Sequence, residues 1–283
     1  MDDVLQGSSA SGPVEHAMLR ISSRGPITRI HLARAMLGRP LRTVEAYLVD
    51  GLLIESGPPA IAPKMVRWCK SQDISQVINS HHHEDHSGGN SLLRAALGLP
   101  VAVPPAAISV LKRSPRLAFY RRVVWGQPDP VDAEPLRDLV ETPNYHFRVI
   151  PTPGHSFDHV CFFEPEQGWL FSGDLFIHER AHYLRVDEDA HQILASLRRV
   201  LALRPVLMIC SHAGFVEDPC NAIQRKIAYW QDLAREASAR LQEGYSVERI
   251  TEELLGPEGL ATRLSRGHFS KRNLISSLLR EPS

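Results

Sequence analysis

Short apolar runs separated by polar or small residues recur along the first three quarters of the chain. Several of them end in Gly, Pro, Asp or Ser, the residues at which strands commonly pass into loops. EPEQG, between two of the runs, has the composition of a hairpin connection. We therefore predict strands at TVEAYLVDG, LLIESG, QVINS, VAVP, FRVIPTPG, VCFFEP, WLFSGD and VLMICS.

A second pattern, in which apolar residues stand three and four positions apart, alternates with these runs. SLLRAALG has this spacing and stops at a glycine. A chain that mixes strands with helices in this way predicts a layered α/β or α+β core. The clearest helical face, in DEDAHQILASLRRVLAL, is formed by Ile193, Leu197, Val200 and Leu201.

From about residue 216 the pattern becomes purely helical. Asp218 suits an N-cap, Pro219 suits the first helical turn, and Gly244 suits the end of the helix. Two shorter helical segments follow in SVERITEELLG and SKRNLISSLL. The longest helix carries an apolar stripe about five turns long, formed by Ile223, Ile227, Trp230, Leu233, Ala234, Ala237 and Leu241.

These patterns divide the chain into three predicted parts. Residues 1–16 are polar and lack periodicity, so we expect a flexible N-terminus. Residues 17–215 form the mixed domain that carries the chemistry, and residues 216–283 form a helical appendage packed on it.

The composition is that of a soluble globular protein, with 43% hydrophobic and 23% charged residues among 283. Lys and Arg together number 32, as do Asp and Glu, so the charge balance favours neither nucleic acid nor an anionic membrane as partner. The N-terminal MDDVLQGSSASG lacks the apolar core of a signal peptide, and no apolar run is long enough to span a membrane. Because the four cysteines form no CxxC pair, we expect a cytoplasmic protein with reduced thiols.

The densest candidate chemistry lies in SHHHEDHSGG, directly after a predicted strand. Alternate side chains of an extended segment share a face, which sets His81 and His83 together and points His82 the other way. Asp85 and His86 fall where the strand gives way to a helix. Imidazole and carboxylate groups are suitable ligands for zinc, with iron or manganese as alternatives. A solvated polar loop is the competing interpretation.

Three further predicted strand ends each carry one residue of a metal-ligand type. These are His155 in TPGHS, Asp174 in FSGDLF and His212 in CSHAG. Singly, each could be an ordinary loop residue. Because active-site residues gather where the strands of layered folds enter loops, the combination favours a shared metal site.

The series HHHEDH, PGHS, SGDLF and SHAG resembles the metallo-β-lactamase superfamily, most closely its glyoxalase II-like hydrolases, over about residues 17–215. The resemblance implies an αββα sandwich with two metal ions in a cleft at one edge of the sheets, and a C-terminal helical extension. It implies Asp85 and Asp174 as the catalytic carboxylates, and leaves His82 and Glu84 as residues between ligands. The implied ligands are His81, His83 and His155 for the first ion, Asp85, His86 and His212 for the second, and Asp174 for both.

Two such ions repel each other, and a shared carboxylate offsets the repulsion. The pair lowers the pKa of bound water to about 7, which provides a nucleophile at neutral pH. We therefore expect a binuclear hydrolase that cleaves an ester-like bond, a thioester or lactone, in a small molecule by means of a metal-bridging hydroxide. The absence of GxSxG, GxxxxGK and GxGxxG motifs leaves serine-hydrolase, P-loop and Rossmann interpretations without support.

Several alternatives remain at this level. Nucleases share this fold, and RLSRGHFSKRNLISSLLR has a mild basic bias, although a nucleic-acid binder usually has a stronger one. A regulatory protein that retains the metal site, a persulfide dioxygenase with one iron, and a homodimer also remain open. A flavodiiron-type oxidoreductase is disfavoured because it would carry a carboxylate where His83 stands.

One position departs from the family pattern. Glu55 in LLIESG replaces the usual aspartate, and we expect it to support a ligand and not to bind the metal itself. His159 is expected to play a similar supporting part. The residues after Asp174 are expected either to line the cleft entrance or to be solvated, namely His178, Glu179, Arg180 and His182.

Overall fold

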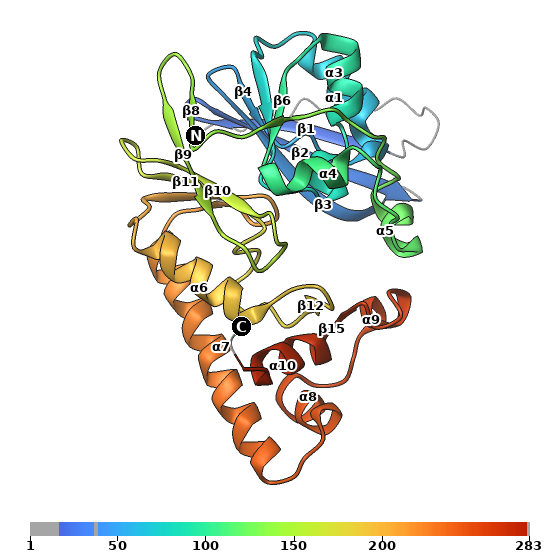
Figure 1. The fold of residues 1–283 in the computed structure, drawn as a ribbon, viewed down its shortest axis with the longest axis vertical. Coiled ribbons are helices and arrows are strands. Elements are labelled where there is room, and N and C mark those ends of the chain that lie inside the picture. Colours follow the sequence, from blue (N-terminus) through green and yellow to red (C-terminus); the bar gives the residue numbers. More distant parts are fainter. Residues whose placement is uncertain (1–16, 37–38, 282–283) are drawn as a thin grey trace.

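The computed structural model describes residues 17–36 and 39–281. The N-terminus predicted to be flexible, residues 1–16, lies outside the described residues. The described chain contains two large sheets, a small two-stranded sheet and a set of helices that cover them (Figure 1).

The first sheet has seven strands whose spatial order follows the sequence. Neighbours from β1 to β4 are antiparallel, and neighbours from β4 to β7 are parallel. Parallel neighbours require crossover connections, which here contain the helices α1 (Ala62–Cys69), α2 (Glu84–Ser87), α3 (Asn90–Leu97), α4 (Ile108–Leu111) and α5 (Phe119–Val124). The strands are β1 (Ala17–Arg24), β2 (Ile27–Met36), β3 (Arg39–Val49), β4 (Leu52–Ile54), β5 (Gln76–Ile78), β6 (Val101–Val103) and β7 (Glu134–Pro135).

The second sheet has six strands in the order β14-β13-β11-β10-β9-β8. The hairpin predicted at EPEQG is confirmed, since Phe163 pairs with Leu170 across it. Strands β11 and β13 are parallel, and the other neighbours are antiparallel. The strands are β8 (Leu139–Glu141), β9 (His146–Pro151), β10 (Val160–Glu164), β11 (Trp169–Gly173), β13 (Leu207–Cys210) and β14 (Gly214–Val216).

The two sheets pack face to face. Their shared core joins Tyr47 and Ile54 of the first sheet to Phe162 and Phe171 of the second. A second cluster lies between the first sheet and α1 and α3, and a third joins the second sheet to α6 (Ala190–Leu201) and the C-terminal helices. The predicted αββα layering is therefore confirmed.

The C-terminal helices are α7 (Pro219–Gln242), α8 (Val247–Leu255), α9 (Leu260–Leu264) and α10 (Lys271–Leu279). As predicted, Asp218 caps α7, accepting a hydrogen bond from the Asn221 amide. Most of the predicted stripe is buried, but Leu241 is 45% exposed because it lies in the last turn of α7. No helix among the described residues combines the length and apolarity needed to cross a membrane.

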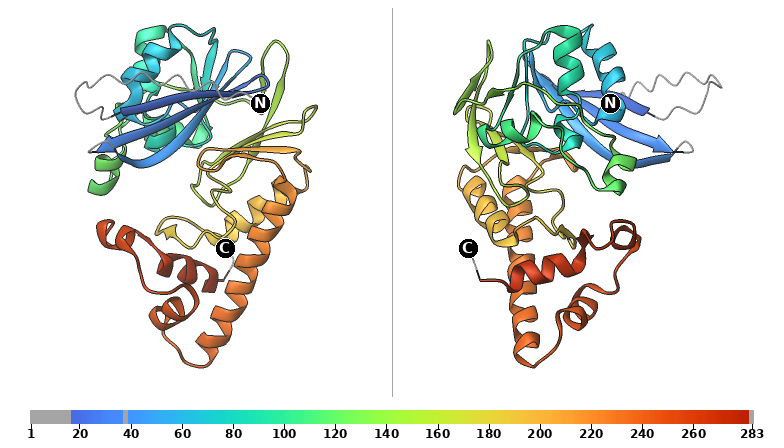
Figure 2. Two further views of the ribbon diagram at one scale, coloured as in Figure 1. Left: turned by 180° about the vertical axis from the view of Figure 1, so that it is seen from behind. Right: turned by 45° about the vertical axis from the view of Figure 1, so that its right-hand side comes forward.

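One feature of this region differs from the purely helical pattern predicted for it. β15 (Phe269–Ser270) pairs with β12 (Leu184–Arg185), which lies between β11 and α6 in the chain. The pair ties the C-terminal helices to the loop that follows the second sheet's central strand (Figure 2). Two-residue strands have no periodicity, so the sequence pattern could not reveal this contact.

Candidate metal centre

Both sheets bring candidate residues to one place. Residues 81–86 follow β5 of the first sheet, with His83 still extended and Glu84 opening α2. His155 lies in the loop between β9 and β10, Asp174 directly follows β11, and His212 lies between β13 and β14. All seven predicted ligands fall into two groups, whose potential ligand atoms lie within 4.8 Å of one another in each group.

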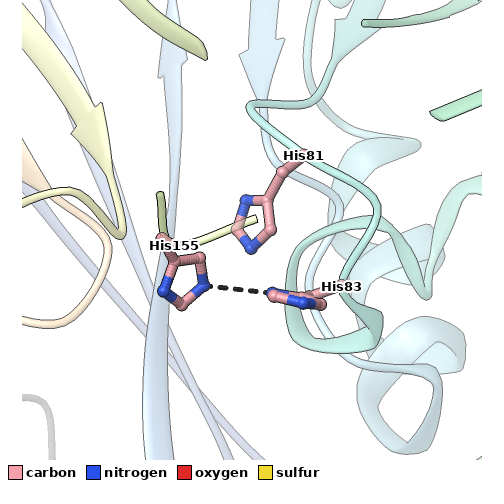
Figure 3. A group of neighbouring side chains, drawn as sticks. All are labelled: His81, His83 and His155. Atoms are coloured by element: carbon pink, nitrogen blue, oxygen red, sulfur yellow. Dashed lines mark hydrogen bonds between the residues drawn. The ribbon is translucent and has the colours of Figure 1, made fainter. Parts of the chain in front are cut away.

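The first group consists of His81, His83 and His155 (Figure 3). Nδ1 of His83 lies 3.0 Å from Nε2 of His155, and the buried Nε2 of His81 has no hydrogen-bond partner within residues 17–36 and 39–281. Burial is the main cause that lowers the pKa of His81 and His83 well below the ordinary value. Both rings are therefore neutral at pH 7 and present lone pairs, the form in which imidazole binds a metal.

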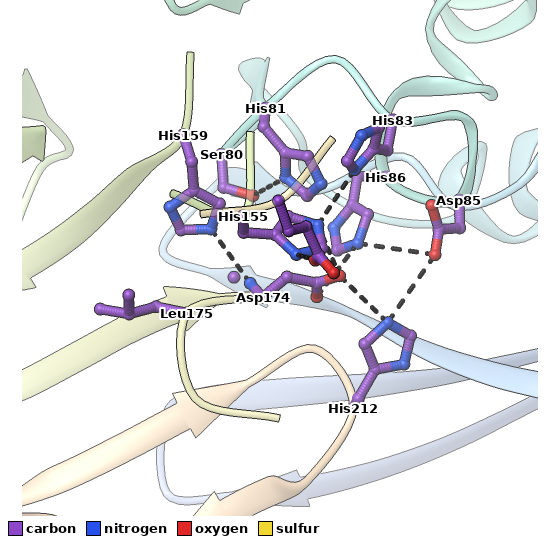
Figure 4. A network of polar contacts seen from close by, with 12 residues as sticks. Ser80, His81, His83, Asp85, His86, His155, His159, Asp174, Leu175 and His212 are labelled. Atoms are coloured by element: carbon purple, nitrogen blue, oxygen red, sulfur yellow. Dashed lines mark hydrogen bonds and ion pairs between the residues drawn. The ribbon is translucent and has the colours of Figure 1, made fainter. Parts of the chain in front are cut away.

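The second group consists of Asp85, His86, Asp174 and His212 (Figure 4). The Asp174 carboxylate lies 3.3 Å from Nε2 of His86 and 3.3 Å from Nε2 of His212. It also lies 3.2 Å from Nε2 of His155, which belongs to the first group. Asp174 is thus a carboxylate within ion-pair distance of histidines from both groups.

The charges of the second group favour a bound cation. Burial opposes charge on His86, yet Asp174 and Asp85 outweigh it and raise the pKa of His86 well above the ordinary value. Burial likewise acts to raise the pKa of Asp174, but His212 and His86 lower it well below the ordinary value. The buried carboxylates therefore attract positive charge, which a dication would supply in place of protons.

Unsatisfied polar atoms also fit a metal at this position. Buried polar atoms in proteins almost always have a hydrogen-bond partner. Here Nε2 of His81, Nε2 of His86 and Oδ1 of Asp174 have none among the described residues. Cations bound between the two groups would satisfy these atoms, so the residues present fit a binuclear centre.

Glu188 is a supporting residue that sequence reasoning missed. Its Oε1 lies 2.5 Å from Nδ1 of His155, which leaves Nε2 of that ring facing Asp174. Glu188 is itself held by the backbone amide of Arg185, and the Arg185 guanidinium donates to the His155 carbonyl oxygen. Its position in DEDAHQ, where acids suit a helix N-terminus, gave no sign of this contact.

Glu55 supports the centre as expected. It is buried and accepts hydrogen bonds from the amide and the hydroxyl of Ser80, whose Oγ lies 2.9 Å from Nδ1 of His81. Its other oxygen accepts from the Asn79 side chain. Glu55 has a φ of 68°, an unusual value for a residue with a side chain. The carboxylate thus holds the strand end from which the histidines project.

His159 and the neighbouring backbone hold Asp174 in place. Nε2 of His159 accepts a hydrogen bond from the Asp174 amide at 3.1 Å, and its Nδ1 lies 2.8 Å from Oγ1 of Thr152. Burial, followed by His155, lowers the pKa of His159 to about 3, so its ring stays neutral. Gly173 has a φ of 48°, and a Cβ there would lie 2.7 Å from His159 and Ser80. His159 therefore supports the candidate centre, as expected, by holding the backbone amide of Asp174.

The two residues between the ligands make contacts of their own, and His82 points away from His81 and His83 as the alternation predicted. His82 bonds to Asp158 through its amide and its Nδ1. Glu84 is buried and forms a two-pronged ion pair with Arg121. Of the residues considered for the cleft entrance, Glu179 pairs with Arg225 and His182 contacts the Tyr229 ring, so these two lie against α7.

A cavity of about 350 Å³ opens beside the first group. His83 and Glu84 form one side, and the segment before α5 forms another. His268, from the loop before β15, lines it as well, and its Nδ1 lies 2.9 Å from the Tyr120 hydroxyl. The C-terminal region therefore contributes to the wall of the cavity next to the candidate metal centre.

The chain is similar to curated proteins that are named as a hydrolase and a thioesterase. Hydroxyacylglutathione hydrolase of Cereibacter sphaeroides is 33% identical over 178 residues, which cover 62% of this chain and 60% of that protein. Thioesterase pkgB of Emericella nidulans is 29% identical over 205 residues, which cover 69% of this chain and 53% of that protein. The chain thus matches less than two thirds of the length of these two relatives.

Solved structures share the fold. A metallo-beta-lactamase family protein from Thermus thermophilus superimposes with a TM-score of 0.61 at 20% identity, covering 93% of this chain and 91% of that one. The protein TTHA1623, solved in a di-iron-bound form, superimposes with a TM-score of 0.54 at 27% identity, covering 64% of this chain and 93% of that one. The sequence model of the Metallo-beta-lactamase superfamily matches residues 39–212, which include both groups of candidate ligands. The chain therefore belongs to the metallo-beta-lactamase superfamily.

Proposed function

We propose that this protein is a binuclear metal-dependent hydrolase that cleaves an ester-like bond, a thioester or lactone, in a small molecule. The observation that carries the proposal is the Asp174 carboxylate, which contacts His155 of the first group and His86 and His212 of the second. A carboxylate between two sets of imidazole and carboxylate ligands suits a pair of cations.

The proposed division of the ligands follows the two groups. His81, His83 and His155 would hold one ion, and Asp85, His86 and His212 the other, with Asp174 shared. Two bound divalent ions supply a water molecule acidified to a pKa of about 7 and a Lewis acid for the carbonyl oxygen. Zinc suits this nitrogen-rich set, and the di-iron form of TTHA1623 keeps iron as an alternative beside manganese.

The chain's own residues orient the ligands, and two nucleophilic side chains of this region, Ser80 and Cys161, are restrained. Glu188 fixes the ring of His155, and the carbonyl of Thr43 accepts a hydrogen bond from Nδ1 of His212 at 2.8 Å. The Ser80 hydroxyl is engaged by Glu55. Burial raises the pKa of the Cys161 thiol to about 12, so it stays protonated at neutral pH.

The relatives favour a thioester over a lactone. The names hydroxyacylglutathione hydrolase and thioesterase both denote proteins that act on thioesters. The cavity beside His83 provides space for a small molecule next to the centre. We therefore propose a small acyl thioester as substrate.

The nuclease alternative gains no support from the C-terminal region. Two of the basic residues that suggested it are engaged within the chain: Arg272 pairs with Glu248, and Nζ of Lys271 donates to the carbonyls of Leu255 and Pro257. Such contacts reduce the charge available to a phosphate backbone.

The test is a comparison of substrates under defined metal loading. We expect two ions per purified chain, and hydrolysis of acyl-glutathione thioesters that exceeds hydrolysis of lactones and phosphodiesters. Chelation should abolish the reaction, and added zinc, iron or manganese should restore it. Turnover that survives thorough metal removal would refute the mechanism, and two bound ions without turnover of any ester would favour a regulatory protein.

A further inference from the structure

A buried lysine lies beneath the candidate metal centre. Lys226 of α7 is 2% exposed and forms no ion pair with a carboxylate among the described residues. Its Nζ donates hydrogen bonds to the carbonyl oxygens of Leu175, at 3.4 Å, and Phe176, at 2.5 Å. The ammonium also lies over the rings of Trp230, 4.9 Å from the centroid, and Phe176.

The two carbonyls belong to the residues that directly follow Asp174. The amide of Asp174 is held by Nε2 of His159, from the second sheet's own layer. The chain beyond Asp174 is held by Lys226, from the C-terminal region. The backbone at Asp174 is therefore held at its amide by the sandwich, through His159, and just after it by the C-terminal region, through Lys226.

The charge of Lys226 is not explained by packing alone. Its side chain lies in an apolar cluster that includes Ile223, Ile227 and Trp230, where an apolar residue would pack without losing hydration. Burial lowers the pKa of Lys226 to about 8, which shows that the surroundings disfavour its charge. Replacing buried charges with apolar residues is often neutral or stabilising. The carbonyl contacts are what distinguish lysine from an apolar residue here.

We propose that Lys226 is a positioning residue for Asp174. By binding the carbonyl oxygens of Leu175 and Phe176, it fixes the shared carboxylate between the two ligand groups. The affinity for metal consequently depends on the docking of α7. This inference rests on the proposed binuclear centre.

Other contacts of α7 with the same loop provide a matched control. Nε1 of Trp230 donates to the carbonyl of Ala181 at 2.9 Å, and Arg225 pairs with Glu179 on the surface. Both contacts hold the loop further along the chain from Asp174. Trp230→Phe removes one hydrogen bond to this loop and keeps an aromatic ring beside Lys226, so it should leave the metal affinity unchanged.

The experiment compares the full-length protein with Lys226→Met, Lys226→Gln and Trp230→Phe. Each is loaded with zinc and titrated with a chelator, and the ions retained per chain are counted. We expect the affinity of Lys226→Met for zinc to be about 10- to 100-fold lower than that of the unaltered protein. The affinity of Lys226→Gln should fall less, because glutamine keeps a hydrogen-bond donor. The Tm of metal-free Lys226→Met should equal or exceed that of the unaltered protein.

Several outcomes would overturn the inference. Unchanged zinc affinity in Lys226→Met, or an equal loss in Trp230→Phe, would show that the carbonyl contacts do not position Asp174. If Lys226→Met is insoluble, Lys226→Gln decides by the same criterion, and insolubility of both would make Lys226 a folding residue. If the unaltered protein itself binds no zinc, the proposed centre fails, and this result differs from a failure confined to the variants.

Discussion

In the proposed centre, Asp174 is the ligand shared by the two metal ions. Its carboxylate contacts His155 on one side and His86 and His212 on the other. Asp174→Ala should therefore leave one ion or fewer per chain and abolish activity, because it removes the carboxylate proposed to bind both ions and the negative charge between two dications. His212→Ala should weaken only the second group. Metal analysis of the purified variants measures both, and two tightly held ions in Asp174→Ala would require a new ligand assignment.

Glu188 should set the affinity of the first group. Glu188→Gln replaces the carboxylate that faces Nδ1 of His155 with a neutral amide, so the ring loses its strongest orienting contact. We expect the affinity for the first ion to fall about 10- to 100-fold, measured by chelator competition. Glu179→Gln, which alters a surface acid paired with Arg225, is the control and should bind metal normally.

Lys226 should make stability depend on pH in the alkaline range. Its pKa is lowered by burial from 10.5 to about 8, so between these pH values the unfolded chain binds a proton that the folded chain has released. Stability must then rise as the pH increases from 8 to 10.5, by at most about 3 kcal/mol. Urea unfolding of the metal-free protein, with Lys226→Met as reference, measures the difference. Parallel pH profiles of the two proteins would contradict the assigned shift.

Residue patterns located the candidate ligands better than the residues that support them. The candidate ligands stand at strand ends, which can be recognised in the sequence and where active-site residues of layered folds gather. They are the residues of HHHEDH together with His155, Asp174 and His212. Glu188 contacts His155, and Lys226 contacts the backbone that follows Asp174, only through the packing of α6 and α7 on the second sheet. No local pattern encodes such contacts, because an acid before a helix and a lysine within one have common alternative explanations.

At the scale of elements, the small β12–β15 sheet brings the C-terminal region to the candidate cavity. Leu184 pairs with Ser270, and the adjacent His268 lines the cavity beside His83. Apolar runs predicted eight strands of the two large sheets, and helical spacing predicted α7, but β1 and β2 were not predicted. The two-residue strands of the small sheet have too few positions to show a period. Leu241 is a second example of what the sequence pattern does not show. It continues the apolar spacing of the α7 stripe but is exposed, because the spacing does not reveal where the helix stops packing on its neighbours.

This arrangement predicts a part for His268 in substrate binding. His268→Ala removes a side chain from the cavity wall and its contact with Tyr120, but no candidate ligand. We expect KM to rise several-fold while kcat and the number of bound ions change little. Steady-state kinetics with an acyl thioester measure the effect. His146→Ala, an exposed residue on β9, is the control, and a loss of ions in His268→Ala would instead place His268 in the support of the metals.

For the whole molecule, the helical region and the sandwich share one core. Ile223 and Trp230 of α7 belong to the same buried cluster as Leu170 and Met208 of the second sheet. A chain truncated after Gly214 would expose this cluster and lose Lys226 as well. We expect little soluble protein, measured as soluble yield and by size-exclusion chromatography, and weak metal binding in whatever remains soluble. A folded, fully active product would show that the C-terminal region is dispensable.

The order of the elements along the chain has a consequence for biosynthesis. A growing polypeptide leaves the ribosome from its N-terminus, and domains tend to fold as they emerge. All seven candidate ligands have been synthesised once the ribosome has translated His212, whereas Lys226 and His268 are translated later. If Lys226 steadies Asp174, a nascent chain can capture cations before it can retain them, and they exchange with the surrounding pool until α7 docks. The metal content of the mature protein would then be fixed at the last stage of its synthesis.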